Sequence, residues 1–358
     1  MRRFLAAAGL VTMLLASVAS AAPGTQSARS TSGPILALAA DGDRAAFVVQ
    51  GRFKECVSVM VWQPQRRRID SLQLARACET NDRGGARTGA PSVALAGTQA
   101  AWRQVGGGNS LETILRAASL QRRAPLFIGA GSTNDGVGSF AGKPVGDGAL
   151  LAFTLDRRCD SNGAESGRPD TQCPPELKTG DIVESTVWRL GGPLRCGGIV
   201  TVKTLTCSVV AKADGELTVL AVDAGRIVVR TGSGARVLTS SGRLIRDLPV
   251  RPLGAALSGN RLALRTDSSV EVYDIRSGEL TTRLPAASGL RLQDLDQDVL
   301  VTATGGTVTL RRLGNGRTST LQPGRTAYAQ LEPSGLFVAG ARRITFMSMR
   351  DVLRRFGG

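Results

Sequence analysis

The sequence predicts an all-β fold, a single β-propeller of seven four-stranded blades. Short runs in which apolar and polar residues alternate fill most of the 358-residue chain, and tight turns rich in glycine and polar residues separate them. Alternation of this kind is typical of half-buried strands. The unit made of these runs recurs along the chain, and repeats of a few tens of residues built from short strands indicate a propeller.

The repeat is clearest in the C-terminal half. Residues 217–230 and 253–265 each contain an alternating run, a tight polar turn and a second alternating run, which predicts an antiparallel hairpin. A third run with a glycine turn follows at 270–279, and a fourth run at 280–284. Each unit therefore has four strands, named a to d from the centre outwards. The turns of the first hairpins are expected at Gly42, Gly97, Gly148, Gly225, Gly259, Gln297 and Gly335.

The spacing of these turns favours seven blades. The last four turns are roughly 34 to 38 residues apart, which suits a blade with tight turns, and radial packing protects the sheet edges. The long interval between Gly148 and Gly225 leaves room for an eighth blade near 182–188, but the stretch 159–175 lacks strand alternation. We therefore predict one blade with insertions here and a propeller over 33–357. Six or eight blades, or another all-β assembly such as two sandwiches, are the alternatives.

Two features resemble known propeller families. The third strands end in Val61-Trp62-Gln63, Val187-Trp188-Arg189 and Val272-Tyr273-Asp274, which resemble the strand ending that carries Trp-Asp in WD40 repeats. The first hairpins at 40–47 and 332–337 are similar to the turns of bacterial TolB-like propellers. The Gly-His dipeptide of WD40 repeats is absent. The resemblance covers nearly all of 33–357 and implies a propeller fold and a protein-interaction role, without a specific activity.

The N-terminus has the pattern of a secretory signal peptide. Met1-Arg2-Arg3 precedes an apolar stretch at 4–18, and Ala19-Ser20-Ala21 gives a cleavage site after Ala21. Residues 1–21 are thus predicted to be removed, and residues 22–32 are expected to form a flexible leader. We expect a secreted, periplasmic or cell-envelope protein with no membrane span in the mature chain.

The composition excludes several function classes. The chain has 45 Lys+Arg, 29 Asp+Glu and no histidine. The absence of histidine excludes catalysis by histidine and metal binding through histidine. The basic residues are scattered and lack the stacking aromatics or recognition helix of nucleic-acid readers. We therefore expect no specific nucleic-acid recognition, and a salt-dependent attraction for anionic envelope polymers.

Loop lengths point to one face of the propeller. The a–b and c–d turns lie on one face, and the b–c and d–a connections lie on the other. Three long segments, 76–90, 156–180 and 204–215, are assigned to the second face next to blades 1–3. Function concentrates on such loops, although neutral insertions are the alternative explanation because longer loops cost little to close. The candidate binding residues are the cationic side chains Arg52, Lys54, Arg83, Arg87, Arg157 and Arg158.

Six cysteines in an exported chain predict disulfides. Cys56 and Cys78 are expected to meet across the open end of a hairpin, and Cys159 and Cys173 bracket the insertion of the third blade. Cys196 and Cys207 remain by elimination. A straight strand over 197–206 would hold their thiols too far apart, so either that segment is a hairpin or the connectivity differs.

We predict a secreted, non-enzymatic and monomeric propeller that uses no cofactor. Its expected partner is a protein or an anionic cell-envelope polymer, bound through the long-loop face of blades 1–3. The alternative is a carboxylate- or calcium-dependent hydrolase or lyase with its site at the central channel. Residues 294–298 carry alternating carboxylates but lack the Gly and Glu of a calcium loop, so they are interpreted as an acidic turn. Trp62, Trp102 and Trp188 are expected to pack between blades.

Overall fold

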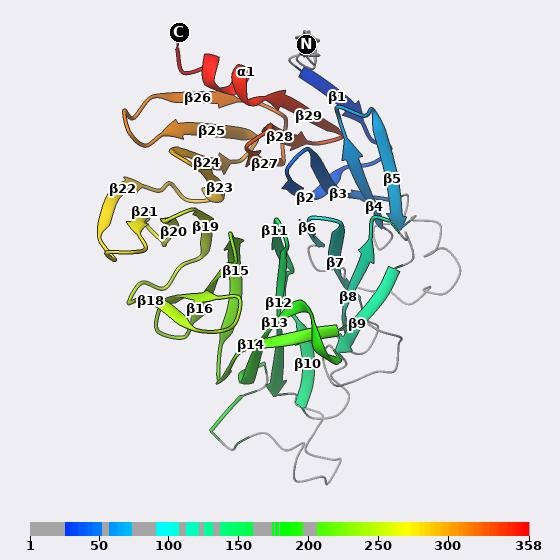
Figure 1. Cartoon of the computed structure of the whole chain (residues 1–358), viewed down its shortest axis with the longest axis vertical. Coiled ribbons are helices and arrows are strands. Elements are labelled where there is room, and N and C mark those ends of the chain that lie inside the picture. The colour runs from blue at the N-terminus through cyan, green and yellow to red at the C-terminus, as the bar shows by residue number, and fades with distance from the viewer. Residues whose placement is uncertain are drawn as a thin grey trace, which may run out of the picture.

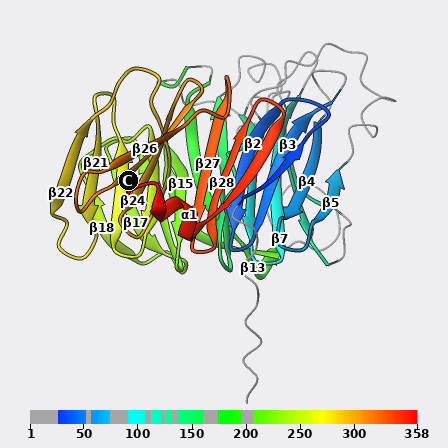
Figure 2. The ribbon, with the colours of Figure 1, turned by 90° about the horizontal axis from the view of Figure 1, so that it is seen from above.

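The described strands form seven sheets arranged around a common axis, and each sheet is one blade (Figure 1). The protein is a seven-bladed β-propeller, as predicted. Seen from the side, the strands of the blades run between two opposed faces that carry the turns (Figure 2). The computed structural model describes residues 26–51, 57–73, 91–106, 112–121, 125–131, 137–159, 174, 176–178, 180–195 and 206–357.

Blades 1 to 3 contain strands β2 to β14. Blade 1 consists of β2 Ile35–Asp41, β3 Arg44–Gln50, β4 Val57–Gln63 and β5 Arg68–Gln73. Blade 2 consists of β6 Ser92–Ala96, β7 Gln99–Gly106, β8 Glu112–Ser119 and β9 Pro125–Gly131. Blade 3 consists of β10 Val137–Ala141, β11 Val145–Asp147, β12 Leu150–Cys159, β13 Ile182–Arg195 and β14 Thr206–Asp214.

Blades 4 to 6 are regular four-stranded meanders. Blade 4 consists of β15 Leu217–Asp223, β16 Arg226–Thr231, β17 Ala235–Thr239 and β18 Leu244–Leu248. Blade 5 consists of β19 Gly254–Ser258, β20 Arg261–Arg265, β21 Ser269–Asp274 and β22 Leu280–Pro285. Blade 6 consists of β23 Arg291–Asp296, β24 Val299–Thr304, β25 Thr307–Arg312 and β26 Thr318–Leu321.

Blade 7 joins the two ends of the chain. Its inner strands are β27 Ala327–Glu332, β28 Gly335–Gly340 and β29 Arg343–Ser348, and its outer strand is β1 Gln26–Ser30. β1 pairs antiparallel with β29, with Ala28 opposite Thr345. The prediction of a flexible leader over 22–32 is therefore wrong for these residues. The reason is that β29 would otherwise present an unpaired edge, which β1 covers.

The first-hairpin turns lie at or next to all seven predicted positions. Gly42 has a φ of 62°, in the left-handed region that glycine enters without strain. Gln297 fills the equivalent position in blade 6 with a φ of 50°. The backbone N–H of Gln297 donates to Ser258 Oγ of the neighbouring blade at 3.0 Å.

The hydrophobic core consists of seven clusters, and each is shared by two neighbouring blades. One cluster joins blades 1 and 2, and the next five join the following pairs in order. The seventh joins blade 7 to blade 1 and closes the ring. Trp62 and Trp102 are buried in two of these clusters, and Trp188 packs against a third. The prediction that the tryptophans pack between blades is confirmed.

A short C-terminal helix, α1 Met349–Arg354, adds to the core between blades 6 and 7 (Figure 1). Ser348 caps it by accepting a hydrogen bond from the Asp351 N–H at 3.3 Å. Val352 and the following Phe356 are buried against both blades. This helix is too short to cross a membrane, and the described residues include no other helix.

Blade 3 is a single blade, so the alternative of an eighth blade near 182–188 is excluded. Those residues belong to β13, which pairs with β12 on one side and β14 on the other. The segment 204–215, expected to be a connection on the long-loop face, is mostly the outer strand β14, so that assignment is wrong. Its alternating burial is weak because the outer strand of a blade is half-exposed, and this hid the strand in the sequence.

The cysteine pairing stays a prediction. Cys159 and Cys207 are both buried, and neither is a free thiol. Cys56, Cys78, Cys173 and Cys196 lie outside the described residues. Arg195 of β13 pairs with Thr206 of β14, and residues 196–205 lie outside the described residues.

Candidate functional site

The a strands of the seven blades line a central channel with two mouths. A cavity of about 340 Å³ lies at one end, and a hollow of about 650 Å³ lies at the other. Both are lined by Val145, Leu220, Ala255 and Gln293, from the middle of the channel. They are therefore the two ends of one channel, and their charges are opposite. We name them the acidic mouth and the basic mouth.

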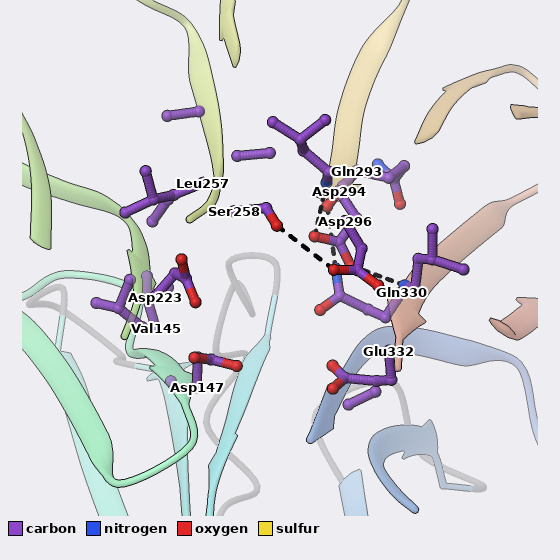
Figure 3. Close-up of a pocket in the computed structure, with 18 of the residues that line it drawn as sticks. Val145, Asp147, Asp223, Leu257, Ser258, Gln293, Asp294, Asp296, Gln330 and Glu332 are labelled. Carbon is purple, nitrogen blue, oxygen red and sulfur yellow. Dashed lines mark hydrogen bonds between the residues drawn. The ribbon is translucent and has the colours of Figure 1, made fainter. Parts of the chain in front are cut away.

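The acidic mouth is built from one repeated position. The last residue of each a strand precedes the a–b turn and points toward the axis, as Figure 3 shows for Asp147, Asp223, Asp296 and Glu332. A carboxylate occupies this position in five of the seven blades. In chain order the residues are Asp41, Ala96, Asp147, Asp223, Ser258, Asp296 and Glu332.

These side chains connect neighbouring blades. Glu332 Oε2 of blade 7 accepts a hydrogen bond from the Gly42 N–H of blade 1 at 2.9 Å. Asp223 Oδ2 of blade 4 accepts one from the Gly259 N–H of blade 5 at 2.6 Å. In each case the acceptor is the last side chain of an a strand. The donor is a backbone N–H in the a–b turn of the next blade. We call each such contact an inter-blade latch.

Two blades depart from the latch pattern. Blade 2 has Ala96 instead of a carboxylate, and Asp41 accepts hydrogen bonds from both Gly97 and Gly148, the latter at 3.2 Å. Blade 7 has Pro333 in the turn, which has no N–H to donate. Asp296 of blade 6 therefore lacks its latch, and its buried Oδ2 has no hydrogen-bond partner among the described residues.

Burial, followed by the proximity of other carboxylates, favours the protonated forms of these groups. Burial, followed by the nearby Asp294, Asp147 and Asp41, raises the pKa of Glu332 to about 8. Burial and the charges of Asp223 and Asp41 raise the pKa of Asp147 to about 6. Burial also raises the pKa of Asp294 to about 7, although its carboxylate accepts hydrogen bonds from the backbone. These three carboxyl groups therefore have pKa values of about 6 to about 8.

Three of these carboxylates lie close enough to share a cation. Oxygen atoms of Asp41, Asp147 and Glu332 all lie within 4.8 Å of one another. Carboxylate oxygens are the ligands that calcium and magnesium prefer. Asp41 and Glu332 already accept turn N–H groups, so the latches use part of this donor set.

The basic mouth opens on the opposite face. Its lining comes from the first residues of the a strands and the last residues of the b strands, so it faces the b–c and d–a connections. Asp156 is its one carboxylate among the described lining residues, and Leu36, Leu253 and Leu292 supply apolar wall. The cationic lining residues are Arg103, Lys143, Arg158, Arg230 and Arg291.

The cations of blades 2 and 3 lie near one another. Arg103 of β7 pairs in register with Ser92 of β6 and donates to the Ala141 carbonyl of blade 3 at 3.2 Å. Desolvation, followed by the charge of Arg158, lowers the pKa of Arg103. Desolvation, followed by the charge of Arg103, lowers the pKa of Lys143. Like charges therefore lie near one another in this sector of the mouth.

Lys143 reaches the mouth because the inner strand of blade 3 is split. β10 pairs with residues 155–159 of β12, and β11 pairs with residues 150–152 at the start of that strand. Between them lies Gly142-Lys143-Pro144. Pro144 has no N–H for the ladder, which favours an interruption at this point. Gly142 still donates its N–H to the Thr154 carbonyl at 2.7 Å and holds the interruption against β12.

Arg158, like the cations of blades 4 and 6, is engaged within the protein. Arg158 forms an ion pair with Asp156 at 2.8 Å and lies over the Phe140 ring. Arg230 forms an ion pair with Glu216, a carboxylate just outside the lining. Arg291 lies over the ring of Tyr328, 5.2 Å from its centroid. These contacts hold three cationic side chains of the lining in place, namely Arg158, Arg230 and Arg291.

The structure separates the sequence-predicted binding residues. Arg158 lines the basic mouth, whereas Arg157, its exposed neighbour on β12, does not. Arg52, Lys54, Arg83 and Arg87 lie outside the described residues. Sequence analysis missed Arg103 and Arg291, which it treated as scattered charges. Arg103 lies near the end of a b strand, and Arg291 begins an a strand. Both strand ends face the long-loop side, and this is the signal that could have identified the two residues.

Comparisons with known proteins give a likeness of fold. No protein-family model matches the chain, and no curated protein matches its sequence. Sqt1 of Saccharomyces cerevisiae is similar with a TM-score of 0.47 and 8% identity over 90% of this chain and 98% of that chain. BamB of Moraxella catarrhalis is similar with a TM-score of 0.43 and 11% identity over 88% and 83%.

The Pan2 WD40 domain of Neurospora crassa has a TM-score of 0.41 and 11% identity over 88% of this chain and 89% of that chain. The assignment of seven blades rests on the strand pairing within this chain and not on these similarities. On that evidence the chain is a seven-bladed β-propeller whose central channel is acidic at one mouth and basic at the other.

Proposed function

We propose that this protein is a non-enzymatic binding propeller whose basic mouth holds an anionic group of its partner, either an acidic protein segment or an anionic cell-envelope polymer. One observation carries the proposal. Five cationic side chains and one carboxylate line a hollow of about 650 Å³ on the face that carries the b–c and d–a connections. This is the face that the sequence analysis selects.

The electrostatics of the mouth favour an anion. Desolvation and neighbouring positive charge lower the pKa values of both Arg103 and Lys143, so the protein holds these cations at a cost. A bound anion would offset that cost by pairing with desolvated donors, where charge-assisted hydrogen bonds are strong. The N-terminal signal pattern supports export, which would bring the mouth to anionic envelope polymers.

A charge reversal inside the mouth tests this function. Lys143→Glu places a carboxylate among the cations, and we expect it to weaken binding of fluorescent polyglutamate and polyphosphate by about tenfold or more. The measurement is fluorescence anisotropy at low salt, with thermal unfolding to show that the variant is folded.

Arg157→Glu is the matched control. It makes the same change in net charge on the same blade, but at an exposed residue that does not line the mouth. We expect less than about a threefold effect, because exposed charges interact weakly. Equal losses in the two variants would show that the anion senses overall charge, and the proposed site would be abandoned.

A second candidate function is calcium-dependent chemistry at the acidic mouth. The close approach of Asp41, Asp147 and Glu332 favours it. If calcium binds there, millimolar calcium should raise the unfolding temperature, and Asp147→Asn should remove most of that rise. An unfolding temperature that calcium leaves unchanged would dismiss this candidate.

A further inference from the structure

We propose that the sector of the basic mouth formed by Ser92, Arg103, Lys143 and Arg158 is a subsite for a phosphoryl group. The inference rests on the proposed function, because it names the anionic group that the basic mouth would take. Its residues come from two blades: Ser92 and Arg103 lie on neighbouring strands of blade 2, and Lys143 and Arg158 belong to blade 3.

The Ser92 hydroxyl points to a ligand rather than to a structural role. Ser92 is 9% exposed, lines the basic mouth and lies opposite Arg103 in the β6–β7 pairing. Its buried Oγ has no hydrogen-bond partner in the part of the chain that the structure describes. A buried hydroxyl without a partner is costly. A ligand oxygen beside Arg103 would satisfy it.

Lys143 supplies the mobile charge of the subsite. It lies in the interruption between β10 and β11, on the blade 3 side of the mouth. It forms no ion pair within the described residues, and after desolvation the like charge of Arg103 lowers its pKa. An ammonium on a flexible stem can close onto an anion that the more rigid guanidinium groups first orient.

The number of donors favours a tetrahedral oxyanion. One ammonium, two guanidinium groups and one hydroxyl belong to residues from two blades that line the same hollow. A carboxylate presents two oxygens in one plane, whereas a phosphoryl group presents three oxygens in different directions and up to two negative charges. The carboxylate of Asp156 lowers the net positive charge of the subsite. It is already engaged, because it forms an ion pair with Arg158 and accepts a hydrogen bond from Ser185 Oγ at 2.8 Å.

Lysine NMR tests the subsite directly, because the chain has only five lysines. Reductive ¹³C-methylation of the full chain gives one signal per lysine, and Lys143→Arg assigns the signal of Lys143. Inorganic phosphate is titrated against acetate at constant ionic strength. We expect phosphate to shift the Lys143 signal saturably and to raise its pKa, while acetate acts at least tenfold more weakly. Lys212, paired with Glu184 on the same blade, should not respond.

Ser92→Ala provides the second variant. It removes only the hydroxyl, and we expect it to weaken phosphate binding about fivefold or more without lowering the unfolding temperature of the ligand-free protein. Unchanged phosphate affinity in this variant would overturn the role of Ser92 and with it the subsite as drawn.

Two anion polymers separate failure of the inference from failure of the proposed function. If polyphosphate and polyglutamate shift Lys143 equally, the mouth binds anions but is not a phosphoryl subsite. If neither polymer nor phosphate shifts Lys143, both the inference and the proposed function are wrong. A response to phosphate and polyphosphate alone supports both.

Discussion

At the scale of single residues, the inter-blade latches define the acidic mouth. Each latch needs an acceptor at the end of one a strand and a donor N–H in the next turn, as in Asp223 and Gly259. The sequence shows both halves, since acidic residues recur before the predicted turns. It does not show that these turns converge, because convergence follows from closing the ring. The sequence therefore predicts an acidic turn at 294–298 but not its place in a larger site.

The latches predict an unusual dependence of stability on pH. The pKa of Glu332 in the folded protein, about 8, lies above its ordinary value, so folding favours the protonated form. Stability from this group is therefore fully present at acidic pH and is lost as the pH rises from about 4.5 to about 8. Asp147, with a pKa of about 6, acts in the same direction. The unfolding temperature should fall between pH 5 and pH 8.5.

Glu332→Gln tests this prediction by removing the charge and keeping an acceptor for the Gly42 N–H. We expect the variant to lose much of the fall in unfolding temperature and to gain about 1 kcal/mol or more at pH 8, because one pKa unit corresponds to about 1.4 kcal/mol. Asp247→Asn, on the exposed side of blade 4, is the control and should keep the wild-type profile. A Glu332→Gln profile that matches wild type would contradict the assignment.

At the scale of elements, the first hairpins were predictable and the outer strands were not. The inner strands bury both faces, as β28 does, and their turns need left-handed residues such as Gly42. Outer strands are half-exposed and tolerate polar residues, so β14 looked like a connection. β1 was missed for another reason: its partner β29 lies at the opposite end of the sequence, and only ring closure brings them together.

The closing strand β1 should contribute measurably to stability. A chain that begins at residue 31 lacks β1 and leaves the edge of β29 unpaired, and we expect it to lose about 2 kcal/mol or more, since each net hydrogen bond contributes about 1 kcal/mol. A chain that begins at residue 26 retains β1 and is the matched control. Urea unfolding compares the two. Equal stability would show that β1 is dispensable.

At the scale of the whole molecule, the net charge of +16 has an uneven distribution that composition could not reveal. Carboxylates gather at one mouth of the channel and cations at the other. The opposed strand ends produce this polarity: the last residues of the a strands face one side, and the last residues of the b strands face the other. From its charge the sequence predicts an anionic partner, and this stays a prediction. The residues that line the mouth come together only in the folded ring.

The most direct test of the basic mouth is the salt dependence of polyphosphate affinity, measured on wild type, Lys143→Glu and Arg157→Glu. Binding that releases counterions gives a linear fall of log affinity with log salt, with a slope set by the number of neutralised charges. We predict a shallower slope for Lys143→Glu and a wild-type slope for Arg157→Glu. Slopes that change equally in both variants would contradict a localised site at the channel mouth.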